Sequence, residues 1–425
     1  MPEAGSSAIG SGGDANIPAW PGNDFSVVPD WIYTSEAVYA RELERIFRGR
    51  TWNFVALEAE IPNAGDFRRS TVGDTPVVVA RNGDGDIHVF QNRCAHRGAE
   101  FCRQNRGNVS AFICPYHKWT YDHSGALIGV PFRRGIQGKG GMPADFRMDD
   151  HATRRLCVAR RGGVVFASFA PDMEPLDTYL GAAILRDFDT VFGRPLNILG
   201  YYRNTLPGNW KLYHENLKDP YHATLLHTYL VSFDLMVAGQ KSAMIADETG
   251  LHGTMASARG DQDAAAKQES KKEMRAAFRE NLKLNDDRIL SFEREFDSPW
   301  SVTMQTIWPN LIVQRELNTL GVRQIVPKGP GEIEMHWVMF GYADDSEAMT
   351  RHRLRQGNLM GPAGFLGIDD NEAITFVQQG LGASLGQSGI VKLGEDGVRN
   401  PDHLLTESAI RDMYRAYARV MGLAP

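Results

Sequence analysis

The chain has 425 residues, of which 42% are hydrophobic and 23% charged, and its formal net charge is −6. At about 150 residues per domain, this length predicts two or three packed domains. The basic residues are scattered, which argues against nucleic acid as the main partner. The apolar runs are too short to span a bilayer, and four cysteines are too few for a disulfide scaffold. We therefore expect a globular cytoplasmic protein with neither a membrane nor a nucleic-acid partner.

Residues 1–22 are rich in Gly, Ser and Pro. They lack the basic and apolar regions of a signal peptide. We predict a flexible N-terminal tail over this range.

The segment from about 40 to 165 has the pattern of short β-strands. The stretch TPVVVARNGDGDIHVFQN (75–92) places an NGDG turn between two runs rich in β-branched residues, which predicts a β-hairpin. This region is expected to form a small antiparallel β domain.

Two Cys/His pairs lie in that domain. Cys94 and His96 have one residue between them, and Cys114 and His117 have two. Zinc-binding pairs normally leave two to four residues between ligands, so one is tight for a structural zinc site. A Rieske [2Fe-2S] cluster, in which each loop gives one Cys to one iron and one His to the other, fits the spacing better. Zinc remains the alternative.

Beyond about residue 166 the pattern is mixed. Long strands are predicted at 301–318 and at 331–343, the second after a KGPG turn. A charged segment, 258–281, predicts a solvated helix or mobile loop, and apolar residues at helical spacing predict a C-terminal helix capped by Thr406. The expected fold class is α+β, with helices flanking an antiparallel sheet.

The stretch ENLKDPYHATLLH carries a second pair of candidate ligands, His222 and His227. Five positions along a regular helix put two side chains roughly 140° apart, so one metal ion could reach both only if the helix is kinked, bulged or ended between Asp219 and His227. Two His and one carboxylate form the open iron site of non-haem oxygenases, which could use electrons from the cluster.

The third ligand is sought in GPAGFLGIDDNEAITFVQQG. Asp369 and Glu372 fit the N-cap and box partner of a following helix, which leaves Asp370 for the metal. Asp369 remains the alternative ligand.

Together these residues resemble the large (α) subunits of Rieske non-haem iron aromatic-ring-hydroxylating oxygenases, especially those acting on salicylate, anthranilate and terephthalate. The stretches CAHRG, GVPFRRG, GNWKL, ENLKDPYH and GPAGF carry the resemblance. It implies an all-β Rieske domain (40–165) inserted in a helix-grip catalytic domain (23–39 and 166–425) with a mononuclear Fe(II). It also implies α3 or α3β3 rings, with a small β subunit in the latter, and electrons from NAD(P)H through a reductase or ferredoxin.

The resemblance also implies roles for single residues. Asp219 would bridge His222 to the Rieske His117 of the adjacent subunit, although an Asp before Pro220 is equally a good N-cap. Asn216 would lie near the iron. Arg323 would bind a substrate carboxylate, although a salt-bridged Arg is the alternative. Arg315 stands where the resemblance predicts glutamine, which leaves the ring substituents of the substrate open.

The expected activity is hydroxylation of the ring of an aromatic carboxylate with O₂. The motifs favour salicylate-type monohydroxylation, and cis-dihydroxylation of anthranilate, terephthalate or another substituted benzoate is the alternative. A pure electron carrier is the competing class, but it would need only the Cys/His pairs and not the second ligand set.

Overall fold

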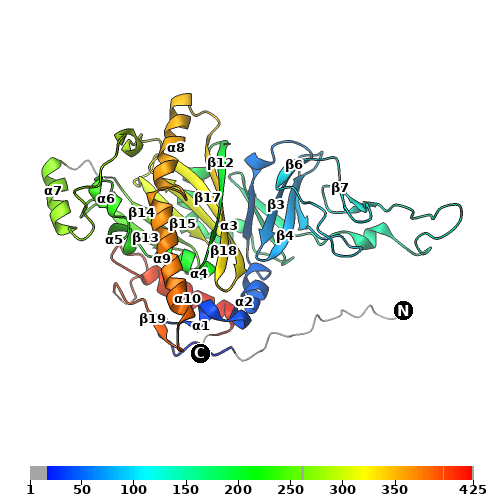
Figure 1. Cartoon of the computed structure of the whole chain (residues 1–425), viewed down its shortest axis with the longest axis horizontal. Helices are drawn as coiled ribbons and strands as arrows, with labels where there is room; N and C mark the ends of the chain where they lie inside the picture. The colour runs from blue at the N-terminus through cyan, green and yellow to red at the C-terminus, as the bar shows by residue number, and fades with distance from the viewer. Residues whose placement is uncertain (1–16, 260–262, 396, 424–425) are drawn as a thin grey trace.

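The computed structural model describes residues 17–259, 263–395 and 397–423. Two parts lie side by side along the longest axis (Figure 1). A β-rich part spans the strands from β2 to β11, and a mixed part built on one large sheet contains most of the helices. The α+β fold class, with an antiparallel sheet flanked by helices, is confirmed. The domain boundaries near residues 40 and 165 stay a prediction.

The β-rich part contains three small antiparallel sheets. The first has the order β5-β4-β3-β6, the second β7-β8-β9 and the third β10-β11-β2. The strands are β2 (Asn53–Leu57), β3 (Asp66–Val72), β4 (Thr75–Arg81), β5 (Ile87–Gln91), β6 (Arg106–Asn108), β7 (Phe112–Ile113), β8 (Thr120–Tyr121), β9 (Leu127–Gly129), β10 (Cys157–Arg161) and β11 (Val164–Ser168). Strands β4 and β5 form the hairpin predicted at 75–92, so that prediction is confirmed.

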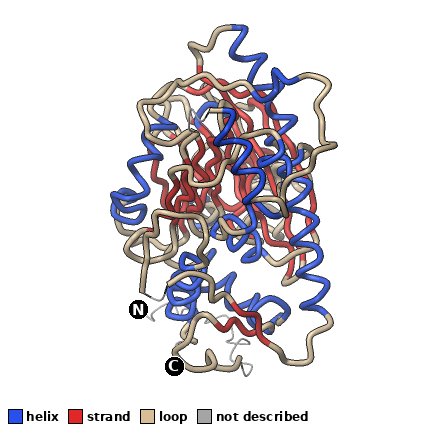
Figure 2. Tube along the Cα trace, turned by 90° about the vertical axis from the view of Figure 1, so that its left-hand side faces the viewer, coloured by secondary structure: helices blue, strands red, loops and turns tan. Residues whose placement is uncertain are grey.

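The mixed part is organised around a seven-stranded antiparallel sheet of order β12-β18-β17-β16-β15-β14-β13. Its strands are β12 (Leu196–Leu206), β13 (Ser242–Ala246), β14 (Gly253–Ser257), β15 (Val302–Ile307), β16 (Leu311–Glu316), β17 (Thr319–Gly329) and β18 (Glu332–Tyr342). The helices are α1 (Trp31–Thr34), α2 (Glu36–Glu42), α3 (Leu176–Phe192), α4 (Trp210–Lys218), α5 (His222–Leu225), α6 (Thr228–Ser232), α7 (Ala264–Glu273), α8 (Glu347–Met360), α9 (Phe365–Gly382) and α10 (Ser408–Met421). Figure 2 shows strands at the centre and helices on the outside.

The two faces of the large sheet pack against different helices. Successive side chains of a strand point to opposite faces. Leu311 and Val313 pack with helix α3 in one hydrophobic cluster, whereas Ile312 belongs to a second cluster with helices α4 and α10. The second face therefore holds α4, the helix that leads into the predicted metal ligands.

Several sequence predictions in this part need revision. The predicted strand 301–318 is two strands, β15 and β16, joined at Trp308–Asn310, because Pro309 has no N–H to continue a ladder. Strand β18 after its turn is confirmed. In the charged segment, α7 is an exposed helix. Thr406 is not the N-cap of α10: Glu407 holds that position, and the Thr406 hydroxyl accepts from the Ser408 amide at 3.1 Å.

The predicted tail is anchored at its inner end. Residues 1–16 lie outside the described part of the chain, but Trp20 is buried. Its ring packs 5.5 Å from Tyr414, and its amide donates to Leu423 O at 2.9 Å. Trp20 therefore anchors the predicted tail at that position, because burial of a large indole is favourable, whereas residues 18, 19, 21 and 22 are exposed. Flexibility of the tail stays a prediction. Among the described residues, no helix has the length and apolar character needed to cross a membrane.

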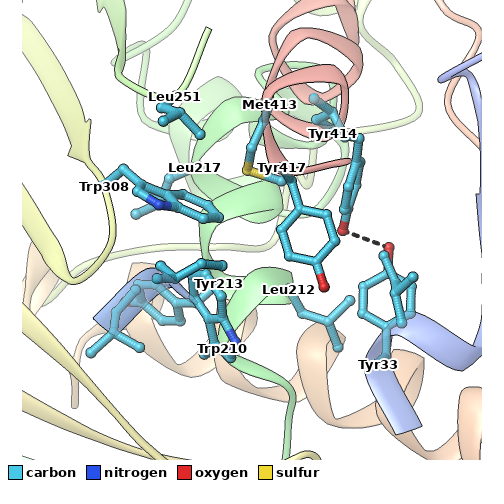
Figure 3. Close-up of a cluster of buried hydrophobic side chains, with 14 of the residues drawn as sticks. Tyr33, Trp210, Leu212, Tyr213, Leu217, Leu251, Trp308, Met413, Tyr414 and Tyr417 are labelled. Carbon is cyan, nitrogen blue, oxygen red and sulfur yellow. Dashed lines mark hydrogen bonds between the residues drawn. The ribbon is translucent and has the colours of Figure 1, made fainter. Parts of the chain in front are cut away.

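A buried charge pair ties three distant segments together beneath α4. Lys211 Nζ lies 2.6 Å from Glu42 Oε1, and both side chains are fully buried. Trp210 Nε1 donates to Glu42 Oε2 at 2.7 Å, and Tyr417 OH donates to Oε1 at 2.6 Å. Figure 3 shows Trp210 and Tyr417 in the aromatic cluster that also contains the Tyr33–Tyr414 hydrogen bond. These contacts hold α2, α4 and α10 in one arrangement.

We predict that Glu42→Ala lowers the free energy of unfolding of the catalytic part by about 3–5 kcal/mol, because it leaves the Lys211 ammonium buried without its carboxylate. The measurement is denaturant unfolding of the variant beside Glu44→Ala, an exposed acid two residues away. Equal stability of the two variants would contradict the role given to the pair.

Candidate active site and metal centres

The helical segment that carries the two histidines is interrupted twice. Helix α4 ends at Lys218, and Asp219 has φ −102° and ψ 89°, outside the helical region. Helix α5 begins at His222 and ends after one turn, and His227 then has φ −83° and ψ 69°. The predicted break between Asp219 and His227 is confirmed.

These breaks bring the two histidines and a distant carboxylate to one point. The Asp370 Oδ1 atom, from α9, lies 3.5 Å from His222 Nε2 and 3.1 Å from His227 Nε2. One ligand atom from each of the three residues lies within 4.8 Å of the others. This donor set fits one mononuclear iron of the two-His, one-carboxylate type, with coordination positions left open.

A second carboxylate holds each imidazole from behind. Asp219 Oδ2 lies 3.3 Å from His222 Nδ1, and Asp369 Oδ2 lies 3.1 Å from His227 Nδ1. Such contacts direct the opposite Nε2 atoms toward the metal position and raise their basicity. The Asp219 carboxylate also accepts from the Tyr221 amide at 2.9 Å, so it caps the next turn as well.

The N-cap role predicted for Asp369 is wrong. Helix α9 begins at Phe365 with Gly364 at the N-cap, so Asp369 and Glu372 lie inside the helix. Adjacent helical residues point about 100° apart, which lets Asp369 and Asp370 approach opposite nitrogens of the same His227 ring. Geometry thus favours Asp370 as the ligand and Asp369 as its outer support.

The electrostatics of the cluster favour a bound cation. Burial lowers the pKa of His222, but its contacts with the Asp219 and Asp370 carboxylates outweigh burial and raise that pKa to about 10. Burial raises the pKa of Asp370, yet its contacts with His222 and His227 lower it further than burial raises it. Asn216 Nδ2 donates to Asp370 Oδ1 at 3.2 Å and lies 3.4 Å from His222 Nε2. The Asp370 carboxylate therefore stays charged in a buried position.

An apolar cavity opens beside this cluster. Its polar lining comes from the three ligands together with Asn216, Ser257 and Glu316. The apolar lining residues are Leu217, Ala223, Leu230, Leu235, Met236, Met255, Val302, Met304, Leu317, Met360, Leu366 and Leu404. Cavities of this composition bind apolar ligands that a few polar groups orient.

The structure places the two arginines differently from expectation. Arg323 is fully buried outside the cavity lining, where its Nη1 donates to Tyr213 OH at 2.8 Å and its guanidinium lies 3.9 Å from the Trp337 ring centroid. Arg315 lies on the opposite face of the sheet, paired with Asp187. Strand alternation turns Arg315 away from the cavity, so it does not contact a ring bound there.

The sequence predicts Asp369 as a helix cap or as the alternative iron ligand, but not as a support of His227. It gives no prediction for Glu316, which lines the cavity. The available signal for Glu316 was the alternation in β16, since Gln314 and Glu316 place two polar side chains on the face where Ile312 is apolar.

The two Cys/His loops have the same backbone geometry. The Cys94 amide donates to Ala99 O at 2.9 Å, and the Cys114 amide donates to Trp119 O at 2.8 Å. Four residues after each Cys, Gly98 and Lys118 have positive φ, 75° and 60°, and their amides donate to the Cys carbonyls. Each loop therefore presents one buried Cys, followed two residues later by His96 in the first loop and three residues later by His117 in the second.

The side chains of the loops divide into a buried and an exposed pair. Cys94 and Cys114 are buried, and Tyr121 OH donates to Cys94 Sγ at 3.2 Å. His96 and His117 are exposed, with ring centroids 4.5 Å apart. Two thiolates inside and two imidazoles outside fit the two irons of a Rieske cluster, whereas zinc would need all four at one ion.

Comparison with known families agrees with this geometry. Residues 51–138 match the Rieske [2Fe-2S] domain, and residues 195–423 match the catalytic domain of the ring-hydroxylating alpha subunit. The chain belongs to the ring-hydroxylating oxygenase alpha subunits. The predicted family, the enzyme class and the two cofactors, a [2Fe-2S] cluster and a mononuclear iron, are confirmed.

Full-length relatives share the whole architecture of this alpha subunit. It is 46% identical to the large oxygenase component of salicylate 5-hydroxylase from Ralstonia sp, over 95% of this chain and 96% of the relative. It is 45% identical to the anthranilate 1,2-dioxygenase large subunit from Burkholderia cepacia, over 96% of each chain. Naphthalene 1,2-dioxygenase from Rhodococcus sp. bound to indole superposes with a TM-score of 0.74 at 25% identity, over 93% of this chain and 94% of that one.

We predict that Asp370→Ala lowers the iron content from about three to about two ions per chain, because the cluster keeps its two irons while the mononuclear site loses its carboxylate. Iron quantification with the visible spectrum of the cluster measures this. Asp369→Asn is the matched control and retains the third iron with weaker affinity, by roughly 10–100-fold. The ligand assignment is reversed if Asp369→Asn, and not Asp370→Ala, loses the iron.

Proposed function

We propose that this alpha subunit hydroxylates the ring of an aromatic carboxylate with O₂, in a salicylate-type monohydroxylation. The observation that carries the proposal is the apolar cavity that shares His222, His227 and Asp370 with the metal site. A planar aromatic ring suits its leucine and methionine walls, and the two metal-bearing histidines lie at its edge. The salicylate and anthranilate names of the similar relatives support the substrate class.

The residues of the chain divide the work around the ring. His222, His227 and Asp370 would hold the iron, which would supply O₂ activation when bound. The apolar walls orient the ring and exclude water from the reacting atoms. Asn216 contacts both Asp370 and His222, so it is proposed to fix their orientation.

Arg323 does not line the cavity, but it pairs with Ile312 and so lies on the same sheet face as the cavity residue Glu316. It remains the proposed partner of a substrate carboxylate that reaches past the present lining. Its Nε and Nη2 atoms are buried and have no hydrogen-bond partner among the described residues. A guanidinium with two unpaired donors suits a carboxylate, which can accept both.

Electron transfer is proposed to cross between subunits. In Figure 1 strand β7, which precedes the second Cys/His loop, lies in the β-rich part, and helix α5, which begins at His222, lies in the mixed part. The two candidate metal centres of one chain thus belong to different parts of the molecule. Both parts of the chain carry exposed apolar side chains. Tyr116 precedes His117 in the second Cys/His loop, and Phe132 lies in the loop after β9. Leu225 and Phe365 lie on α5 and α9, the helices of His222 and Asp370. Such side chains favour burial in an assembly. We propose an α3 or α3β3 ring.

Asp219 is the proposed bridge in that ring. Its carboxylate contacts His222 Nδ1 and is partly exposed, which supports the proposal that it also contacts His117 of the partner subunit. A ferredoxin or reductase would supply the electrons from NAD(P)H. The four cysteines are unpaired, which fits the proposed cytoplasmic location.

The test of the proposed function is turnover of the holoenzyme with a generic reductase, NADH and ¹⁸O₂, on a panel of salicylate, anthranilate, benzoate and terephthalate. We expect a hydroxylated salicylate that contains one labelled oxygen, identified by mass spectrometry. A diol with two labelled oxygens from any member would establish the alternative, cis-dihydroxylation. Uncoupled oxygen consumption with no hydroxylated product from the panel would contradict an aromatic carboxylate as substrate.

A further inference from the structure

One ionisable side chain lines the cavity without being a metal ligand. Glu316 is 5% exposed, and the other polar lining residues outside the ligand set are Asn216 and Ser257. A carboxyl group in an apolar wall is costly unless it gains a hydrogen-bond partner. Its presence therefore calls for an explanation in terms of what it binds.

The backbone next to Glu316 is strained and firmly held. Glu316 pairs with Thr319 across a two-residue hairpin, in which Leu317 has φ 57°, a conformation that usually requires Gly. The turn is fixed because the Asn318 amide donates to Gln356 Oε1 at 2.8 Å. Strain held in place by surrounding contacts is characteristic of functional sites, and here it sets the position of the Glu316 side chain.

The carboxylate has one satisfied and one open oxygen. Gln314 Nε2 donates to Oε2, and the same amide donates to Met360 O at 2.8 Å, which fixes it. The other oxygen, Oε1, accepts no hydrogen bond from the residues that the structure describes. Burial raises the pKa of Glu316, and the nearby Arg323 charge opposes that shift. The group thus has one acceptor position to offer to a molecule in the cavity.

We propose that Glu316 selects aromatic acids with a hydrogen-bond donor ortho to the carboxylate, by accepting that donor's proton in a hydrogen bond. The hydroxyl of salicylate and the amino group of anthranilate are such donors. Benzoate and terephthalate have no donor at that position. This inference rests on the proposed function and narrows its substrate class.

The test is the dissociation constant of the oxidised holoenzyme for salicylate and for benzoate, measured by calorimetry. A hydrogen bond to a charged group predicts that salicylate binds roughly tenfold or more tightly than benzoate. Glu316→Gln is expected to weaken salicylate by roughly fivefold, because its amide oxygen accepts the same hydrogen bond without the charge, and to change benzoate by less than about twofold. The matched control, Glu332→Gln, makes the same change at an exposed position on the sheet and keeps the wild-type ratio.

The role of Glu316 and the binding of aromatic carboxylates can fail separately. A wild-type ratio near one, or an unchanged ratio in Glu316→Gln, overturns the role of Glu316 while leaving an aromatic carboxylate as substrate. If the wild type binds neither acid, the proposed function itself fails. The visible cluster spectrum checks that the variant is folded, and Glu316→Asp, which withdraws the carboxylate by one methylene, provides a second measurement with the same expected loss.

Discussion

The break in the helical segment after Lys218 is the constraint on which the active site depends. A continuous helix would point His222 and His227 in different directions, roughly 140° apart. Two short interruptions instead bring both imidazoles to Asp370. The N-terminal turn of α4 is held by Lys211, which pairs with the buried Glu42. Tyr417 of α10 donates to the same carboxylate, and α4 also contacts the sheet and α10. These contacts fix α4 although it ends after Lys218.

The site keeps the Asp370 carboxylate charged although it is buried, a position in which an isolated carboxylate would be protonated. The cluster contains two imidazoles, the buried ligand Asp370, and the outer carboxylates of Asp219 and Asp369. The contacts of these carboxylates with the two imidazoles stabilise positive charge among them, either protons on the histidines or a metal ion. The two outer carboxylates contact different rings: Asp369 contacts His227, and Asp219 contacts His222. The bridge to a neighbouring subunit is the role proposed for Asp219.

Much of this architecture could be predicted from sequence because it is encoded in local spacing. The Cys/His pairs and the five-residue separation of His222 and His227 are chemical requirements that few other structures impose. The choice between Asp369 and Asp370 was harder, because it depends on where α9 begins, and a Gly at the N-cap gives a weaker signal than an Asp.

The remaining errors arose from tertiary contacts. Arg315 and Glu316 are neighbours in sequence, but only the sheet determines which of them faces the cavity. Burial of Trp20 depends on Tyr414, which lies almost 400 residues later. The strand 301–318 contained its own signal in Pro309, which ends β15 and separates it from β16.

The central claim is that one interrupted segment both holds the iron and receives the electrons, with Asp219 between the subunits. Single turnover of the reduced holoenzyme with O₂ and salicylate, followed through the visible spectrum of the cluster, tests it in Asp219→Asn. We predict that this variant keeps both metal centres, as checked by its iron content. Its cluster should be reoxidised at least tenfold more slowly than in the wild type, because the carboxylate proposed to link the two imidazoles is lost. A tenfold decrease in rate corresponds to about 1.4 kcal/mol in the activation free energy. Reoxidation at the wild-type rate, with both metals bound, would contradict the claim.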